Sequence, residues 1–132
     1  MQLLEDVRSV FERRRWVSLA YLFGSRARGD AREDSDFDFA VLASGKPRGW
    51  GVGELQAELV KVLNTADDKV DVLLLNDAPL DLAYKAISEG VLVFERSREE
   101  RVRYEEWVLR MYLDFKPSLE RYYRTLVRRL VG

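Results

Sequence analysis

The stretch GSRARGDAREDSDFD, residues 24–38, combines two kinds of chemistry. It opens with the pair Gly24-Ser25 and, after ten further residues, ends in an Asp-x-Asp formed by Asp36 and Asp38. Apolar runs flank it on both sides, so the Gly-Ser pair is expected where one strand ends and the aspartates where the next begins. This spacing predicts a phosphate-holding turn beside a metal-holding pair of carboxylates.

The carboxylates are expected to share one face of the predicted sheet. Asp36 and Asp38 are two residues apart on a strand, so their side chains leave the same side. Two carboxylates that close repel each other unless a cation lies between them, and hard oxygen ligands suit Mg²⁺ or Mn²⁺. A third carboxylate, Asp71, interrupts the apolar run KVDVLLL, where an unpaired buried charge would be costly. We expect Asp71 to face the same two cations, which would lie about 4 Å apart as in phosphoryl-transfer sites.

The first half of the stretch has the composition of a phosphate site. Glycine at position 24 lets the backbone approach a phosphate closely, and Ser25 adds a hydroxyl and could cap a short helix. Free N–H groups at the start of such a helix attract anions. Arg26 and Arg28 lie in the same turn and could neutralise phosphate charge.

Plainer interpretations exist for each of these residues. The acidic residues Glu33, Asp34, Asp36 and Asp38 could form a solvated loop, although the Gly-Ser pair, its spacing and Asp71 would then all be coincidental. Asp71 itself could lie at a strand end or on an edge strand. Arg26 and Arg28 could be surface residues that contact no phosphate.

Composition excludes several competing chemistries. The 132 residues suit one domain with a modest core. There is no cysteine and no histidine, which rules out disulfides, thiolate or imidazole metal sites and Ser-His or Cys-His nucleophiles. No segment approaches the roughly 18 apolar residues of a membrane span, and the N-terminus is charged and amphipathic rather than signal-like. We therefore expect a cytoplasmic protein without membrane contact.

Charge is distributed unevenly along the chain. Residues 1–95 hold 12 Lys and Arg against 17 Asp and Glu, a net charge of −5, whereas residues 96–132 hold 10 against 6, a net charge of +4. The basic C-terminal part could meet an acidic partner or nucleic acid, or it could be the solvated face of a long helix.

Hydrophobic periodicity predicts an α+β domain with a small mixed sheet. From Ser97, with Glu100 at N3, a capped helical region begins, and Pro117 divides or kinks it. We expect helices to cover one face of the sheet and an acidic cleft to open on the other. Residues 44–53 are predicted to form a flexible loop, the helices to span 2–14, 54–63 and 80–89, and the strands to span 17–23, 36–43, 69–75 and 91–94.

The pattern Gly-Ser, ten residues, Asp-x-Asp and a distal Asp on an apolar strand resembles the minimal nucleotidyltransferases of the polymerase-beta-like superfamily. In particular it resembles the MntA-type antitoxins encoded beside HEPN-domain toxins. The order of elements around the motif fits residues 1–95, and YLDFKPSLERYY, residues 112–123, also resembles the tail of these antitoxins. All three acidic positions are filled.

The resemblance implies one nucleotidyltransferase domain over 1–132, with a palm-like catalytic core in 1–95 and a C-terminal helical extension in 96–132. It implies Mg²⁺-dependent transfer of AMP from ATP to a tyrosine of a partner HEPN ribonuclease toxin. Asp36 and Asp38 would hold both ions, and Asp71 would complete the site and help deprotonate the hydroxyl. Gly24 and Ser25 would hold the β- and γ-phosphates. A hetero-oligomer with the toxin is expected, with no direct binding of nucleic acid.

The remaining aromatic residues bear on what the acceptor is. Trp50, in a Gly-Trp-Gly segment, could stack on a base, act as a lid or simply pack. Trp107, Tyr112, Tyr122 and Tyr123 indicate helix packing or a partner interface. A small acceptor such as an aminoglycoside is an alternative, although so short a chain has little room to bind one alone. A module that neutralises a toxin by contact, without catalysis, is another.

Overall fold

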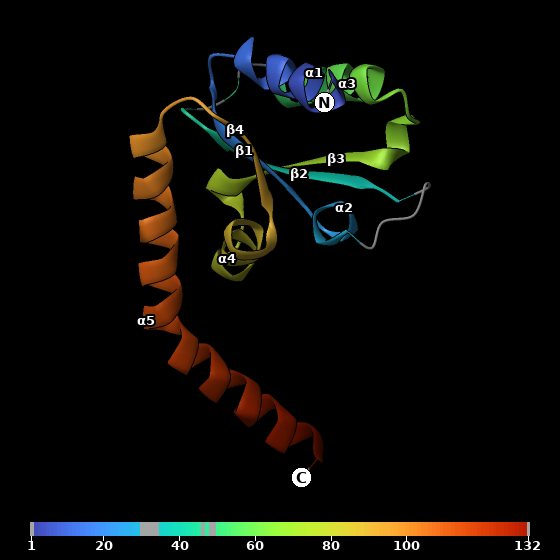
Figure 1. The fold of residues 1–132 in the computed structure, drawn as a ribbon. Helices are drawn as coiled ribbons and strands as arrows, with labels where there is room; N and C mark the ends of the chain where they lie inside the picture. Colours follow the sequence, from blue (N-terminus) through green and yellow to red (C-terminus); the bar gives the residue numbers. More distant parts are fainter. Residues whose placement is uncertain (1, 30–34, 46, 48–49, 132) are drawn as a thin grey trace.

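One four-stranded mixed sheet forms the centre of the molecule. The computed structural model describes residues 2–29, 35–45, 47 and 50–131 (Figure 1). The strand order is β3-β2-β1-β4; β1 pairs antiparallel with β2 and β4, and β2 pairs parallel with β3. The strands are β1 (Val17–Phe23), β2 (Phe37–Ala43), β3 (Val70–Leu74) and β4 (Val91–Glu95). This arrangement confirms the predicted α+β class and mixed sheet.

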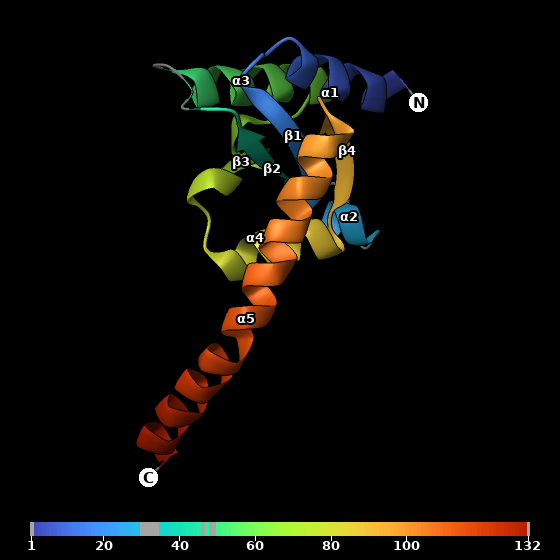
Figure 2. The same cartoon turned by 90° about the vertical axis from the view of Figure 1, so that its left-hand side faces the viewer.

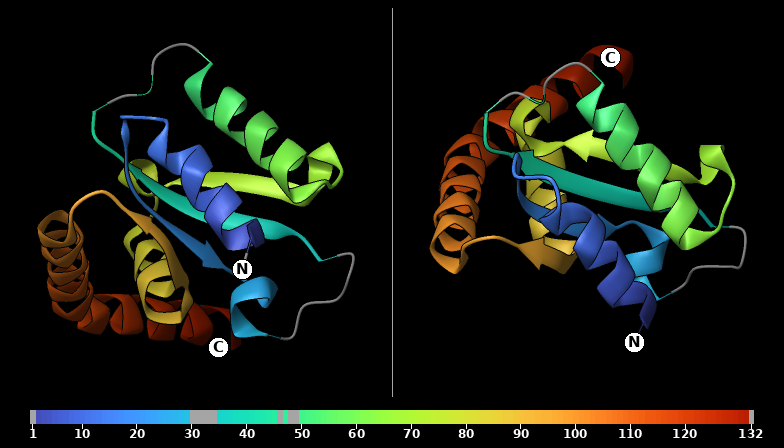
Figure 3. Two further views of the ribbon diagram at one scale, coloured as in Figure 1. Left: turned by 45° about the horizontal axis from the view of Figure 1, so that its top comes forward. Right: turned by 90° about the horizontal axis from the view of Figure 1, so that it is seen from above.

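Helices lie on both faces of the sheet, which corrects the expectation that one face would be free of them. On one face lie α1 (Gln2–Glu12) and α3 (Gly51–Leu63); on the other lie α4 (Leu80–Glu89) and the first part of α5 (Arg98–Val131) (Figures 1 and 3). Short turns complete the order: α2 (Ser25–Arg28) after β1, and two 3-10 turns, η1 (Asp67–Lys69) and η2 (Leu75–Asp77), around β3. The three-layer arrangement leaves the ends of the sheet, rather than a whole face, for function.

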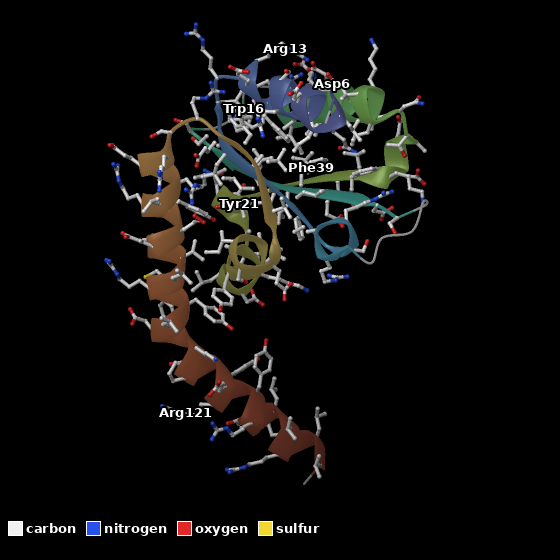
Figure 4. The ribbon with its side chains drawn as sticks, viewed as in Figure 1. Asp6, Arg13, Trp16, Tyr21, Phe39 and Arg121 are labelled. Carbon is white, nitrogen blue, oxygen red and sulfur yellow. The ribbon has the colours of Figure 1, made fainter. Side chains whose placement is uncertain are left out.

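Alternation along the strands divides the apolar side chains between two cores. Phe39 and Val41 of β2 join the core beneath α1 and α3, whereas Ala40 joins the core beneath α4 and α5. Figure 4 shows Phe39 on the α1 side of the sheet and Tyr21 on the opposite side. Because Asp38 has the same parity as Ala40, its side chain leaves the sheet on the α4 side.

The long helix α5 has two parts that differ in their contacts. We call residues 98–112 the inner half and residues 113–131 the outer half. In the inner half Val108 is fully buried, Ser18 Oγ donates to Glu100 Oε1 at 3.0 Å, and the Tyr112 ring stacks on Tyr84 at 3.8 Å. The helix bends near its middle (Figure 1), and the outer half continues beyond the sheet (Figure 2). In total α5 has 34 residues, a length of about 50 Å.

Most predicted boundaries agree with the structure to within a few residues. The bounds of β1 and α4 are those expected, and Glu100 N–H donates to Ser97 Oγ at 3.3 Å, as the predicted cap requires. The loop predicted for 44–53 is wrong at its end, because α3 already begins at Gly51. Pro117 lies inside one continuous helix and does not divide it. No helix of the described part of the chain is long and apolar enough to cross a membrane.

Candidate active site

Three aspartates come together at the end of the sheet where β2 and β3 begin. Asp38 of β2 and Asp71 of β3 are direct partners in the parallel register, so their side chains leave the same face side by side. Asp36 immediately precedes β2 and shares that face because it lies two residues before Asp38. Strand pairing therefore brings the three predicted aspartates to one end and one face of the sheet. Glu33 and Asp34, the other members of the acidic run, lie outside the described residues.

The electrostatics of Asp38 indicate a site that attracts cations. Burial raises the pKa of its carboxyl above the ordinary value, and the neighbouring charges of Asp71 and then Asp36 raise that pKa further. A cation between these groups would relieve the repulsion. Their oxygen donors fit Mg²⁺ or Mn²⁺ in chemistry. Among residues 2–29, 35–45, 47 and 50–131, no three acidic side chains are close enough to form a ready-made metal-binding group.

Asp71 lies on the strand beside Asp38, as predicted, but the argument that led to this prediction was wrong. That argument assumed that Asp71 is buried. β3 is an edge strand and Asp71 is exposed, so the side chain bears no burial cost that needs a metal to explain it. Its edge position is the plainer interpretation considered above. The pairing with Asp38 is what relates Asp71 to the site.

Gly24 brings the turn after β1 directly against Asp38. Its φ of 78° lies in the left-handed region that favours glycine. A Cβ at this position would lie only 2.7 Å from Asp38 Oδ2, a distance at which the carboxylate would have to move. The glycine therefore serves both the backbone conformation and the close approach of the turn to the acidic cluster.

The turn continues as a single helical turn, α2. The N–H groups of Ala27 and Arg28 donate to the Gly24 carbonyl at 3.1 and 3.2 Å. Gly24 rather than Ser25 occupies the N-cap, and no side chain caps α2. Ser25 is the first residue of α2 and lies beside the glycine that contacts Asp38. The two halves of the motif thus lie next to each other, as their spacing predicts.

The two arginines of the turn differ in their surroundings. Arg26 is partly buried; its Nη2 donates to the Ser35 carbonyl at 2.9 Å, and its guanidinium lies 4.1 Å from the centre of the Phe37 ring. Arg28 is exposed at the end of α2. Of the two, only Arg28 has a side chain directed largely to solvent.

One charged neighbour of the site was missed from the sequence. Lys69, at the end of η1, places Nζ 3.8 Å from Asp36 Oδ1. In the predicted strand 69–75 it precedes Asp71 by two residues, so the alternation expected there would put both side chains on one face. That spacing was the available signal, and it would have added a cation to the predicted cluster.

Trp50 lies far from this cluster along the sheet. It is 84% exposed and precedes the first turn of α3. The chain reaches it from Ala43, which pairs with Val17 at the opposite end of β2 from Asp38. The structure therefore does not bring Trp50 to the aspartates, and its high exposure argues against a packing role.

Comparison with known proteins identifies the family of the chain. Residues 5–99 match the family model described as polymerase beta, nucleotidyltransferase. The chain belongs to this nucleotidyltransferase family. The matched range contains the Gly-Ser turn and all three aspartates, and it ends where α5 begins.

The chain is similar to a protein adenylyltransferase, and its fold is similar to chains solved in toxin–antitoxin complexes. A protein adenylyltransferase MntA from Aphanizomenon flos-aquae (strain 2012/KM1/D3) is 26% identical over 101 residues, which cover 71% of this chain and 67% of that protein. A crystal structure of a toxin–antitoxin with AMP-PNP matches with a TM-score of 0.76 at 21% identity, covering 98% of each chain. A tri-AMPylated Shewanella oneidensis HEPN toxin in complex with MNT antitoxin gives 0.71 at 19% identity, covering 99% of this chain and 98% of the other. The predicted resemblance to MntA-type antitoxins and the predicted fold are confirmed.

Proposed function

We propose that this nucleotidyltransferase is an antitoxin that transfers AMP from ATP to a tyrosine hydroxyl of a HEPN ribonuclease toxin, with release of pyrophosphate. The observation that carries the proposal is the contact of the Gly24 turn with the Asp38 carboxylate, beside its strand partner Asp71. Support for the acceptor comes from the similar proteins, one a protein adenylyltransferase and another solved with an AMPylated HEPN toxin.

Each residue of the site has a role in this proposal. Asp36 and Asp38 would hold two Mg²⁺ ions, and Asp71 would complete one of the two ligand sets. When bound, the ions would neutralise phosphate charge and favour both bond making and bond breaking. The Gly24 and Ser25 turn would hold the β- and γ-phosphates, and Arg28 would add charge at the rim. Mn²⁺ has the same preference for oxygen ligands and could replace Mg²⁺.

The proposed step forms one bond and breaks one bond. The tyrosine oxygen attacks the α-phosphorus of ATP, and the bond from that phosphorus to the oxygen bridging to the β-phosphate breaks. Pyrophosphate leaves with the electron pair, and Asp71 helps to accept the hydroxyl proton. The chain contributes position and charge rather than a covalent intermediate, since most of the barrier in phosphoryl transfer is overcome by alignment and electrostatic stabilisation.

The outer half of α5 is the proposed docking element for the toxin. It exposes large apolar side chains, among them Leu113 at 64%, Tyr122 at 59% and Leu130 at 85%. It also carries five basic and two acidic residues, so it suits a partner with an apolar and acidic surface. A hollow of about 480 Å³ lies where this half passes the start of α4, between Leu80 and Phe115. A protein acceptor accounts for these features better than a small molecule does.

Transfer to the partner tests the proposal. The chain would be mixed with α-labelled ATP, Mg²⁺ and the small helical protein encoded beside it, which should carry an Arg-x4–6-His motif and a nearby Tyr. Asp36→Ala and Asp38→Ala should each abolish labelling, whereas Asp77→Asn, an exposed aspartate beyond the far end of β3, should not. Undiminished labelling by the Asp36 or Asp38 variants would overturn the assignment.

Contact alone is a second candidate function, and the exposed outer half of α5 is the observation that favours it. Under this alternative Asp38→Ala would still protect cells fully from the toxin at ordinary expression. Both activities are compatible, because an enzyme that modifies a protein must first bind it. Thin-layer assays with aminoglycosides and other small hydroxyl compounds separate a small-molecule transferase from both.

A further inference from the structure

Arg26 connects the two halves of the site through contacts that a phosphate ligand would not need. Its side chain leaves the first turn of α2, next to the glycine that touches Asp38. Its Nη2 donates to the Ser35 carbonyl at 2.9 Å, and its guanidinium lies over the Phe37 ring at 4.1 Å. The two contacted residues are those immediately before and after Asp36.

The chemistry of these contacts suits a planar guanidinium. One edge donates to a carbonyl while the flat face lies on an aromatic ring, whereas an ammonium group has no flat face to stack on the ring. Phe37 is itself packed against the core beneath α1 and α3. The arginine therefore ties the turn to a segment that the core already holds, and Asp36 lies within that segment.

We infer that Arg26 is a positioning residue that fixes the backbone around Asp36 relative to the Gly24 turn, so that the carboxylates and the phosphate-holding turn stay in register. This differs from the role of phosphate ligand suggested by the sequence, and it rests on the proposed function. Its loss would move Asp36 with respect to the turn, because residues 35–37 would then be held to α2 less firmly. Small displacements of positioning groups cost catalysis far more than binding.

A set of four variants separates positioning from phosphate binding. Arg26→Ala removes the contacts with Ser35 and Phe37, and Arg26→Lys keeps the charge but not the plane. Phe37→Leu removes the aromatic ring under the guanidinium and keeps an apolar side chain against the core. Arg15→Ala, an exposed arginine after α1, is the matched control. Positioning predicts that the Arg26 variants and Phe37→Leu lower kcat by about 10- to 100-fold with KM for ATP changed by less than about threefold. Arg15→Ala should leave both constants unchanged.

Hydrogen–deuterium exchange supplies a measurement that does not depend on activity. In protein free of metal and nucleotide, Arg26→Ala should speed exchange of the amides of residues 35–38 by about tenfold or more, with the β4 amides as the internal reference. Melting temperatures show whether Phe37→Leu remains folded, and Arg26→Lys serves in its place if it does not. If Arg26→Lys restores kcat, or if exchange at residues 35–38 is unchanged in Arg26→Ala, the positioning role is overturned.

The two proposals fail in different ways. If Asp38→Ala still labels the partner, the adenylyl-transfer assignment fails, whereas the exchange result for Arg26→Ala stands independently. If Asp38→Ala is inactive but the Arg26 variants lose affinity for ATP rather than turnover, the enzyme assignment holds and Arg26 is a phosphate ligand.

Discussion

At the acidic end of the sheet, strand pairing and a glycine turn fix the functional groups, whereas the outer half of α5 presents its side chains largely to solvent. Asp38 is held between Phe23 on one side and Asp71 on the other. In the outer half, Leu130 and Val131 are more than four-fifths exposed. The first region has excess negative charge and the second excess positive charge.

The difference shows which part of the proposed reaction each region can determine. A site whose groups are already aligned needs only its cations and nucleotide, so it can set the chemistry without the partner. A basic helix with exposed apolar residues and an internal proline is weakly held on its own, because Pro117 removes a backbone hydrogen bond at a cost of about 3 kcal/mol. A partner would stabilise this helix, which makes the outer half suited to selecting the acceptor.

The largest effect is expected from deleting the outer half of α5. This deletion removes one of the two compared regions and leaves the acidic end of the sheet intact. A stop codon after Tyr112 keeps the Tyr84–Tyr112 stack and the three aspartates of the site, Asp36, Asp38 and Asp71. Burying one large apolar side chain contributes about 1.5–3 kcal/mol, so the loss of two or more contacts should weaken partner binding by about 100-fold or more. Titration calorimetry with the partner measures this loss.

Nucleotide binding provides the control for that deletion. The truncated chain should bind AMP-PNP with Mg²⁺ as the full chain does, because the Gly24 turn and the carboxylates are intact. Equal partner affinity for both chains would show that docking uses another surface. Loss of nucleotide binding would show that the two regions are not separable.

A smaller effect on stability and partner binding is expected from changing Tyr112, where the inner half of α5 meets the outer half. Tyr112 stacks on Tyr84 with the ring planes only 3° apart, and such a pair contributes about 0.5–1.5 kcal/mol beyond its buried area. Tyr112→Leu should lower the melting temperature by a few degrees and weaken partner binding several-fold, because the outer half is then less firmly directed. Tyr123→Leu, a change of the same type at an exposed site, should leave the melting temperature unchanged. If Tyr112→Leu melts at the same temperature as wild type, the Tyr84–Tyr112 stack does not hold α5 to the rest of the fold.

The sequence predicted the acidic end better than it predicted α5, for a physical reason. The Gly-Ser turn and Asp36 and Asp38 lie within one short segment whose flanking strands are marked by apolar runs, so local patterns suffice to place them. The pairing of Asp71 with Asp38 is a long-range contact, and spacing could suggest it but not establish that β3 is an edge strand. The contacts of Arg26 with Ser35 and Phe37 depend on how the turn folds back, which no periodicity encodes.

The sequence also located the helices better than it located the face of the sheet that each helix covers. The apolar spacing located α1, α3 and α4, yet it could not show that α4 and the inner half of α5 cover the face that bears Asp38. That arrangement depends on Tyr21 of β1 and Val108 of α5 joining one core on that face, although they are far apart in the chain. It corrected the expected open face to a site at one end of the sheet.

The smallest effect is expected on stability, from the charge of Asp38 at the acidic end of the sheet. The outer half of α5 does not contribute to this effect. Burial and the charges of Asp71 and Asp36 raise the pKa of Asp38 in the folded chain above its ordinary value of 3.8. The folded state therefore holds this proton more tightly than the unfolded state. Its stabilising contribution is complete below pH 3.8 and is lost as the pH rises through the raised value.

Asp38→Asn should accordingly raise the melting temperature of the metal-free, nucleotide-free chain at pH 7, while abolishing transfer. Because Asp38 is partly exposed and screened, the rise should be at most roughly 3 °C. The difference should shrink as the pH approaches 4, since the wild-type carboxyl is then increasingly protonated. Mg²⁺ should reduce this difference in melting temperature at pH 7, because it stabilises the wild-type chain more than it stabilises Asp38→Asn. Melting curves with chelator and with Mg²⁺ between pH 4 and 8 measure both effects. If Asp38→Asn melts at a lower temperature than wild type at pH 7, the contacts of Asp38 stabilise the fold by more than its charge destabilises it.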